Sequence, residues 1–462
     1  MPEAIQTLEH ALALAVQQHR KGDFQDAEAS YMKLLQANPN HYGLLANLGI
    51  LAKQRQKYDQ AKDFFLTALK VKPQYAGAHY NLGNLLQELG QYQKAQQCFQ
   101  KALQINPHHA HANNSQGFGL HNLGEHEKAQ HCFEESLRIE PDYPAAHCNL
   151  GITLLLHADF KRGFDEYEWR KKLPAFKKPY KKPDLGSLEW KGEDLNGKTI
   201  LIFSEQGLGD TIHFARYVYL LEEKYTATII FYAQKRLVHL FQNNSFEVIT
   251  DNNRIPVHDY HIYLMSLPRI FHKEAKSFPQ QINYIPKNQN ISSKWADNLL
   301  GLNGIKVGIN WQGSKTNVRD KYRSIPLDLF APLFNLHGID FISLQRGYGT
   351  AQINGFKFKD RLIGSLSEIE IDSEKNAFEE TIGLLQHLDL VITVDTALAH
   401  LSSTLGLKTW VLLPITPDWR WFLDSEKTPW YESTKLYRQE KFNEWRSIIA
   451  SIREDLFRLT QI

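Results

Sequence analysis

The chain has 462 residues, 42% of them hydrophobic and 23% charged, which is enough for two to three domains of about 100 to 200 residues each. Its 53 Lys and Arg against 51 Asp and Glu give a formal charge of +2, too small a field to attract a polyanion, so no nucleic-acid partner is expected. Three cysteines cannot form a disulfide framework, and no close pair of Cys or His has metal-ligand spacing. We therefore expect no metal.

The N-terminal residues lack the pattern of a secretory signal. No basic segment precedes a long apolar stretch, and the apolar run from Ala11 to Val16 is short. No run approaches the roughly 20 apolar residues that span a bilayer. We expect a soluble, cytoplasmic protein without a transmembrane segment.

The first third of the chain is a repeat array whose small residues and prolines recur every 34 residues, the tetratricopeptide period. The recurring positions are Gly49, Gly83, Gly117 and Gly151, then Ala61, Ala95 and Ala129, then Pro73, Pro107 and Pro141. The small residues allow two antiparallel helices to touch, and the prolines end each second helix. With an earlier copy that ends at Pro39 and a fifth that lacks its proline, about five repeats form an α solenoid over residues 1–171.

Stacked helical pairs leave a concave face lined by the first helix of each pair. A polar row lies on these helices: Asn47, Asn81, Ser115 and Asn149. These side chains either hold a peptide or protein partner in the groove or bond to one another between neighbouring helices, because a buried amide must find a partner.

A basic, proline-containing linker is expected over residues 172–187. Seven Lys or Arg crowd the stretch from Arg170 to Lys182, and prolines at 174, 179 and 183 exclude a regular helix. The alternative is a patch that binds phosphate or a membrane surface. That alternative leaves open a peripheral association with the inner membrane.

From residue 188 onward, short apolar strands alternate with helix-length segments, which predicts parallel sheets covered by helices. The first series comprises Thr199–Phe203, Ala227–Tyr232, Phe246–Thr250 and His261–Met265, with a helix over Thr211–Leu221; the second comprises Lys306–Trp311, Phe341–Gln345, Leu388–Val394 and Thr409–Leu413. Each series suffices for one Rossmann-like lobe, the N-terminal one at 188–303 and the C-terminal one at 304–462, closed by a helix over Asn443–Leu459. Two such lobes across a cleft are the plan of a GT-B glycosyltransferase.

Ligands bind open parallel sheets at the carboxyl ends of the strands. In the C-terminal lobe, a strand ends at Asp395 and a helix starts with Thr396 and Ala397, whose free backbone N–H groups could hold a diphosphate. His400, one turn further, could donate to a phosphate oxygen. The alternative is that Asp395 is an N-cap and His400 a packing histidine.

A polar loop follows Trp311 and runs through Gly313, Ser314 and Lys315, with cations at Arg319, Lys321 and Arg323. Arginine suits bidentate phosphate recognition. The alternative is a solvated loop whose charges face Asp320.

The turn of the N-terminal lobe, residues 207–210, has two glycines, but Ile212 replaces the third glycine of the dinucleotide fingerprint. A dehydrogenase is therefore disfavoured. Asp210 is either a helix cap or, where it faces a cleft, a base that accepts the proton of an acceptor hydroxyl. Further on, the stretch from Asp418 to Trp421 either stacks a base or sugar ring or packs in the core.

These stretches together resemble those of bacterial proteins that fuse tetratricopeptide repeats to a domain similar to glycosyltransferase family 9, the ADP-heptose:lipopolysaccharide heptosyltransferases. The matching stretches are Glu205 to Thr211, Phe214 to Tyr217, Ser266 to Pro268, Trp311 with Gly313, Arg323 to Pro326, Ser343 to Gln345, Val394 to Ala397, Ala399 to Leu401, Pro417 to Trp421, Ser425, Pro429 to Tyr431, and Arg438 with Gln439. They span nearly all of residues 188–440.

The resemblance implies an inverting, metal-independent GT-B transferase that needs no cofactor and moves a sugar from a nucleotide-diphosphate sugar to a hydroxyl of a glycan or protein acceptor. It assigns the diphosphate to Asp395, Thr396 and Ala397, the base to Asp210, and a phosphate contact to Lys315, Lys321 or Arg323. The expected donor site is completed by Gly209, Trp311, Gly313, Ser314 and His400.

Two departures from the family suggest a different sugar: His213 stands where the family usually has Gln, and Ser402 to Thr404 replace a run richer in alanine and glycine. The layout also looks like that of O-linked N-acetylglucosamine transferase, which suggests that the repeats present a protein acceptor. The alternative function is a scaffold whose degenerate GT-B lobes bind without turnover.

Overall fold

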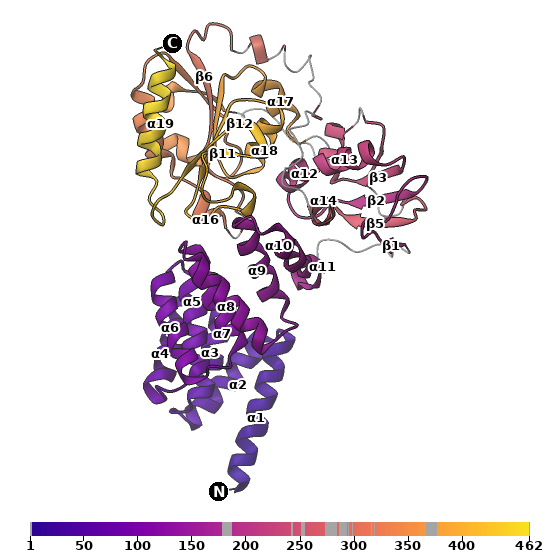
Figure 1. Cartoon of the computed structure of the whole chain (residues 1–462). Coiled ribbons are helices and arrows are strands. Elements are labelled where there is room, and N and C mark those ends of the chain that lie inside the picture. The colour runs from indigo at the N-terminus through magenta and orange to yellow at the C-terminus, as the bar shows by residue number, and fades with distance from the viewer. Residues whose placement is uncertain are drawn as a thin grey trace. The chain divides into compact units, whose positions relative to one another are not determined.

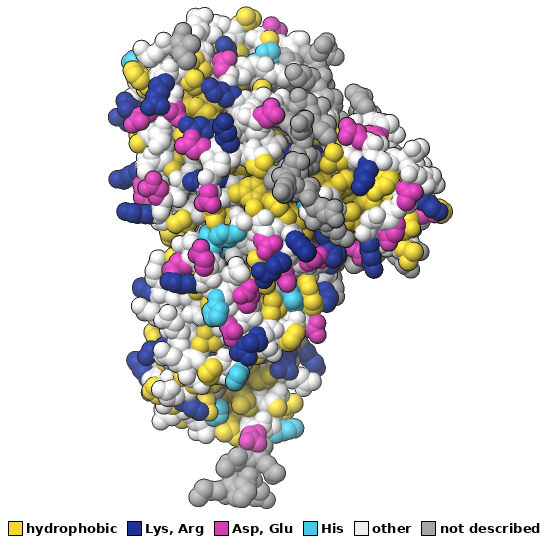
Figure 2. All heavy atoms as spheres, in the orientation of Figure 1, with side chains coloured by type: hydrophobic (Ala, Val, Ile, Leu, Met, Phe, Trp, Pro, Cys, Tyr) yellow, Lys and Arg dark blue, Asp and Glu magenta, His cyan; other side chains and the backbone are white. Residues whose placement is uncertain are grey.

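The structure is a computed structural model that describes residues 2–177, 187–241, 244–250, 255–272, 284–285, 293, 295–297, 299–315, 317, 319–365 and 377–461. The chain divides into two compact units, residues 1–153 and 154–462. On the face seen in Figure 2, basic and acidic side chains are interspersed, in keeping with the small net charge.

The first unit is a stack of helices joined by short turns (Figure 1). The helices are α1 (Pro2–Lys21), α2 (Phe24–Ala37), α3 (Tyr42–Gln54), α4 (Tyr58–Val71), α5 (Ala76–Glu88), α6 (Tyr92–Ile105), α7 (Ala110–Asn122), α8 (His126–Ile139) and α9 (Pro144–Leu156). Helix α9 continues from the first unit into the second. The sequence repeat thus produces a helical solenoid.

The 34-residue period arises from contacts between a glycine and an aromatic ring. A Cβ atom placed on Gly83 would lie 2.6 Å from Phe99, and the equivalent atom on Gly49 would lie 2.5 Å from Phe65. Both rings are fully buried. Because a larger residue has no room there, each helical pair requires glycine on its first helix.

Replacing Phe99 with alanine should lower the free energy that protects α5 and α6 from opening by about 3 to 5 kcal/mol, because the change leaves a cavity under Gly83. Amide hydrogen exchange of the full chain would measure the loss. Leu89→Ala is the control: Leu89 is 40% exposed, so its truncation should change protection by less than about 0.5 kcal/mol. Equal protection in both variants would contradict the glycine–aromatic explanation.

The second unit begins with the end of α9 and then has α10 (Phe160–Tyr167), η1 (Glu168–Lys172) and α11 (Pro174–Lys177). The chain therefore forms short helical turns at the start of the expected linker, with Pro174 at the first position of a turn, where proline is tolerated. Residues 178–186 of the linker lie outside the described residues.

The first sheet has the order β1-β5-β2-β3-β4, and all its strands are parallel. Its strands are β1 (Leu188–Glu189), β2 (Thr199–Phe203), β3 (Thr228–Tyr232), β4 (Glu247–Ile249) and β5 (Tyr260–Tyr263); the associated helices are α12 (Leu208–Phe214), α13 (Arg216–Lys224), η2 (Lys235–Phe241), η4 (Leu264–Ser266) and α14 (Leu267–Phe271).

The helix predicted over Thr211–Leu221 is two helices that meet at Ala215. At the break, the Val218 N–H bonds to the Ala215 carbonyl three residues back (2.8 Å), and the Arg216 side chain donates to the His213 carbonyl (2.8 Å). These two bonds replace the regular helical pattern there.

The second sheet has the order β11-β12-β10-β9-β6-β7-β8 and is parallel apart from β11. Its strands are β6 (Ile305–Asn310), β7 (Ile339–Ser343), β8 (Leu362–Ser365), β9 (Leu390–Val394), β10 (Thr409–Leu413), β11 (Lys427–Thr428) and β12 (Tyr431–Arg438); the associated helices are α16 (Asp320–Arg323), η5 (Leu327–Asn335), η6 (Thr350–Gly355), η7 (Lys359–Arg361), α17 (Glu379–Leu385), α18 (Ala397–Thr404), η9 (Trp419–Trp421) and α19 (Arg446–Leu459). The predicted parallel sheets are confirmed.

Candidate functional site

The turn after β2 places Asp210 in the first turn of α12. One carboxylate oxygen accepts the backbone N–H of Gly207 (2.8 Å), as a helix cap does, and the other accepts a hydrogen bond from the Arg420 guanidinium (2.5 Å). Asp210 therefore caps its own helix and also faces a residue that follows strand β10 of the second sheet. Burial raises the pKa of Asp210, and the positive charge of Arg420 opposes that rise.

The junction after β9 presents a helix start without a side-chain cap. Thr396, rather than Asp395, is the N-cap residue of α18, and its side chain makes no capping bond. The Asp395 carboxylate is buried and accepts the indole N–H of Trp421 (2.9 Å). Burial is the main reason why the pKa of Asp395 is raised. Thr396 and Ala397 are half-buried.

The two junctions touch each other, although one follows strand β2 of the first sheet and the other follows strand β9 of the second. A Cβ atom placed on Gly209 would lie 3.0 Å from the Ala397 Cα and 3.4 Å from His400 Cδ2. The absence of a side chain at Gly209 allows α12 to approach α18 this closely. The structure thus brings Gly209 and Asp210 beside Thr396 and Ala397.

His400 is a buried packing residue. Its Nδ1 lies 3.0 Å from the Tyr431 hydroxyl, and its ring stacks on Trp421 at 5.1 Å. His213, from α12, places its own Nδ1 2.8 Å from the same hydroxyl. These contacts engage the His400 ring within the protein. They favour the role of a packing histidine over that of a hydrogen-bond donor to phosphate.

The histidines make stability depend on pH. Burial lowers the pKa of His400 to about 3 and that of His213 well below its ordinary value. Both rings are therefore neutral when folded but gain protons when unfolded below about pH 6.5. Above that pH the two rings cost no stability, and the free energy of unfolding decreases as pH falls below it. For His400 the decrease is about 1.4 kcal/mol per pH unit and continues to about pH 3.

His400→Asn should therefore reduce the slope of unfolding free energy against pH by about 1.4 kcal/mol per unit between pH 6 and 4. All nine tryptophans lie in residues 154–462, so urea unfolding followed by tryptophan fluorescence reports on this unit. The control is His10→Asn: His10 is exposed in the solenoid, so its replacement should leave the slope unchanged. An unaltered slope in His400→Asn would contradict the assignment.

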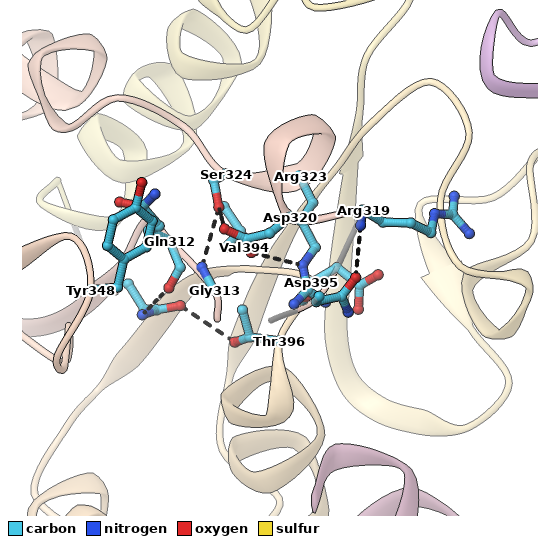
Figure 3. Close-up of polar contacts among 12 residues, drawn as sticks. Gln312, Gly313, Arg319, Asp320, Arg323, Ser324, Tyr348, Val394, Asp395 and Thr396 are labelled. Carbon is cyan, nitrogen blue, oxygen red and sulfur yellow. Dashed lines mark hydrogen bonds and ion pairs between the residues drawn. The ribbon is translucent and has the colours of Figure 1, made fainter. Parts of the chain in front are cut away.

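The loop after β6 is tied to the junction after β9 by Arg323 (Figure 3). The guanidinium pairs with Asp320 (3.2 Å) and donates to the backbone carbonyl of Asp395 (2.6 Å). The Gly313 N–H donates to the Ser324 hydroxyl (3.2 Å). Arg323 thus faces Asp320, as the structural alternative expected, and also reaches the candidate donor site.

The other cations of this loop differ in their surroundings. Lys315 is exposed, and its ammonium lies 3.8 Å from the centre of the Tyr348 ring. Lys321 is exposed beside the Tyr322 ring, and Arg319 donates to the Thr416 carbonyl (3.0 Å). Ser314 is also exposed. Among these cations, Arg323 makes the hydrogen bond to the Asp395 carbonyl, while Lys315 lies exposed over the Tyr348 ring.

Trp311 requires a correction. We expected it in the donor site, but its side chain is fully buried in the core of the second sheet together with Val307 and Ile309. Trp419 and Trp421 are buried as well. These indoles pack in the protein interior and do not present a face to a ligand.

Two residues outside the predicted catalytic and donor sites complete the arrangement. Arg420 is buried and pairs with Asp418 (2.5 Å) as well as Asp210. Gln345 accepts the backbone N–H groups of Trp311 (3.2 Å) and Gln312 (2.9 Å) and so shapes the loop after β6. Both residues lie in stretches that carry the family resemblance, and that resemblance was the sequence signal that could have pointed to them.

The groove residues of the solenoid are half-buried. Asn149 donates to the Asn114 side chain (2.9 Å), as the inter-helix alternative expected. Asn47 borders a cavity of about 570 Å³. Asn47, Asn81 and Ser115 make no side-chain hydrogen bond to the part of the chain that the structure describes.

Within the described ranges, no three His, Cys, Asp or Glu side chains cluster as metal ligands. No described helix combines the length and apolar character that crossing a bilayer requires.

Comparison with known proteins identifies the repeats. Family models described as "Tetratricopeptide repeat" match residues 12–41, 76–109 and 110–143, and one described as "TPR repeat" matches residues 51–90. Protein FlbA of Caulobacter vibrioides is 24% identical over 316 residues, which are 63% of this chain and 51% of FlbA. The chain thus spans about half the length of this relative.

Several solved structures resemble about a third of the chain. PilF of Pseudomonas aeruginosa is 19% identical and covers 36% of this chain and 76% of its own, with a TM-score of 0.35. MamA is 24% identical and covers 36% of this chain and 97% of its own, with a TM-score of 0.31. YrrB, a TPR protein with an unusual peptide-binding site, is 22% identical and covers 36% of this chain and 85% of its own, with a TM-score of 0.30. The predicted repeats are confirmed by the family models: this chain carries tetratricopeptide repeats, which serve protein interaction, followed by an α/β region of parallel sheets.

Proposed function

We propose that residues 154–462 form a GT-B glycosyltransferase, which moves a sugar from a nucleotide-diphosphate sugar to a hydroxyl of a glycan or protein acceptor. The contact between Gly209 and Ala397 carries the proposal. It places a carboxylate, Asp210, beside a helix start without a side-chain cap at Thr396. A base and an anion-binding helix end, each following the last residues of a parallel strand, are what such a transfer needs.

The donor diphosphate would rest on the first amides of α18, where the positive end of the helix dipole favours negative charge. Arg323 and Lys315 would add positive charge from the loop after β6. The Asp395 carboxylate accepts the Trp421 indole N–H, which engages it within the protein. These features together suit an anion without a metal ion.

In the transfer step, Asp210 would take the proton of the acceptor hydroxyl while that oxygen attacks the anomeric carbon and the nucleoside diphosphate leaves. A single displacement of this kind inverts the anomeric configuration. Burial makes Asp210 a stronger base than an exposed aspartate, because it disfavours the charged form. The tetratricopeptide repeats would recruit the acceptor or a partner protein.

A binding module without turnover is the second candidate. It is favoured by the ion pair between Asp210 and Arg420, which engages the proposed base within the protein. Nucleotide sugars would then bind without being consumed.

Isothermal titration with ADP- and UDP-sugars, together with an assay for released nucleoside diphosphate, separates these candidates. The transferase predicts binding and release in the presence of an acceptor, and the module predicts binding alone. Thr396→Trp should weaken donor binding at least tenfold, because a bulky side chain blocks the helix amides. Thr460→Trp, at a half-buried position near the end of the chain, is the matched control. A protein that binds no nucleotide sugar would contradict both candidates.

A further inference from the structure

The segment after the solenoid packs against parts of the second unit that follow both sheets. In α10, the Phe164 ring lies 6.1 Å from His272, beyond the first sheet, and 5.7 Å from Trp419, beyond β10 of the second. Asp165 pairs at the surface with Arg269 of α14 (2.6 Å). Helix α10, which the sequence assigns to the last repeat copy, is therefore part of the α/β unit.

A buried ion pair follows α10. The Arg170 guanidinium bonds to both carboxylate oxygens of Glu205, at 2.7 and 3.3 Å, and also donates to the Ser266 hydroxyl (2.8 Å). Arg170 is 3% exposed and Glu205 is fully buried. Glu205 also accepts the Met265 N–H (3.1 Å). A buried charge pair with this many hydrogen bonds holds its partners in one geometry.

Glu205 is the first residue of the turn that leads to Asp210. The next residue, Gln206, has φ of +64°, which is uncommon for a residue other than glycine and persists only where the surroundings enforce it. Here the Gln206 side chain donates to the Tyr167 hydroxyl (3.0 Å). Gly207 then donates its N–H to Asp210. A continuous path of bonds thus runs from η1 and α10 to the Asp210 carboxylate.

We infer that Arg170 is a positioning residue for the proposed transfer: with Tyr167, it holds the turn over residues 205–210 so that Asp210 faces Arg420 and α18. The inference rests on the proposed function, since it concerns the geometry of the proposed base. It follows that the last repeat helix contributes to the transferase and is more than an attachment for the repeats.

Arg170→Lys tests the inference, because lysine keeps the charge but cannot form the two parallel bonds to Glu205. In the full chain, hydrogen exchange of the amides of residues 206–210 should quicken at least tenfold. The turnover number should fall 10- to 100-fold while the Michaelis constant for the donor stays within threefold. Tyr167→Phe, which removes only the bond to Gln206, should cause a smaller change of the same kind.

Arg269→Gln is the matched control, because it removes an exposed bond between α10 and the first-sheet region while leaving the turn untouched. It should match the wild type in both readouts. Unchanged exchange at residues 206–210 in Arg170→Lys would overturn the inference, and so would faster exchange spread evenly over the unit. Hydrogen exchange needs no substrate. If the protein has no transferase activity but Arg170→Lys speeds exchange only at residues 206–210, the positioning role of Arg170 is supported and the proposed function alone is contradicted.

Discussion

Asp210→Asn should lower the rate of the proposed sugar transfer by about 10³-fold, while the dissociation constant for the donor changes by less than about threefold. A positioned general base contributes about 10² to 10⁴ in rate, and asparagine retains the bond to Gly207 but cannot take a proton. Single-turnover assays and titration calorimetry measure the two effects separately.

Asp418→Asn is the control for this change, because Asp418 is the other carboxylate that pairs with Arg420. If the loss in Asp210→Asn came from freeing Arg420, both variants would lose activity alike. A base requires Asp210 to be ionised, so kcat/KM should fall as pH drops through its pKa, which lies above the ordinary value for aspartate. Arg420→Gln should move that fall to higher pH, because it removes the positive charge that opposes the rise.

Gly209→Val should lower the rate of the proposed transfer at least about 100-fold and also weaken donor binding. Its Cβ would meet the Ala397 Cα at 3.0 Å and the Ala397 Cβ at 3.3 Å, and the first of these contacts can be relieved only by moving backbone. The start of α12 would then move away from α18, and a misplacement of about 1 Å can cost 10² in rate. Activity assays with calorimetry would show both losses.

Gly355→Val is the matched control, because a Cβ at Gly355 meets no atom within 4 Å. It should bind donor and turn over as the wild type does. Wild-type activity in Gly209→Val would mean that the contact between α12 and α18 plays no part in the site.

Much of the fold was predictable where burial dominates. Strands β2 and β10 have the predicted bounds, and β10 is buried along its whole length, as central strands of parallel sheets are. Strand β12 was missed because its middle, Glu432 to Lys435, is polar and its apolar residues do not alternate with polar ones. The break at Ala215 was missed because it coincides with a hydrogen bond from the Arg216 side chain to the His213 carbonyl. Helix propensity does not predict such a bond.

The part of the candidate site that directly follows strand ends could be predicted from the sequence. Asp210 and Thr396 follow buried strands, and the carboxyl ends of parallel strands meet at one edge. Trp311 was misplaced although alternation along β6 offers a signal, since Val307, Ile309 and Trp311 share the core face. The pairing of Arg420 with Asp210 depends on how distant segments fold together, which no local pattern encodes.

The Tyr431 hydroxyl has one hydrogen to offer, and two uncharged imidazoles lie within bonding distance of it. At most one ring can accept that hydrogen, so the other must carry its own on Nδ1. The tautomeric states of His213 and His400 are thereby interlocked, and a change that fixes one restricts the other. Nitrogen-15 chemical shifts of the two rings would reveal which member of the pair is the acceptor.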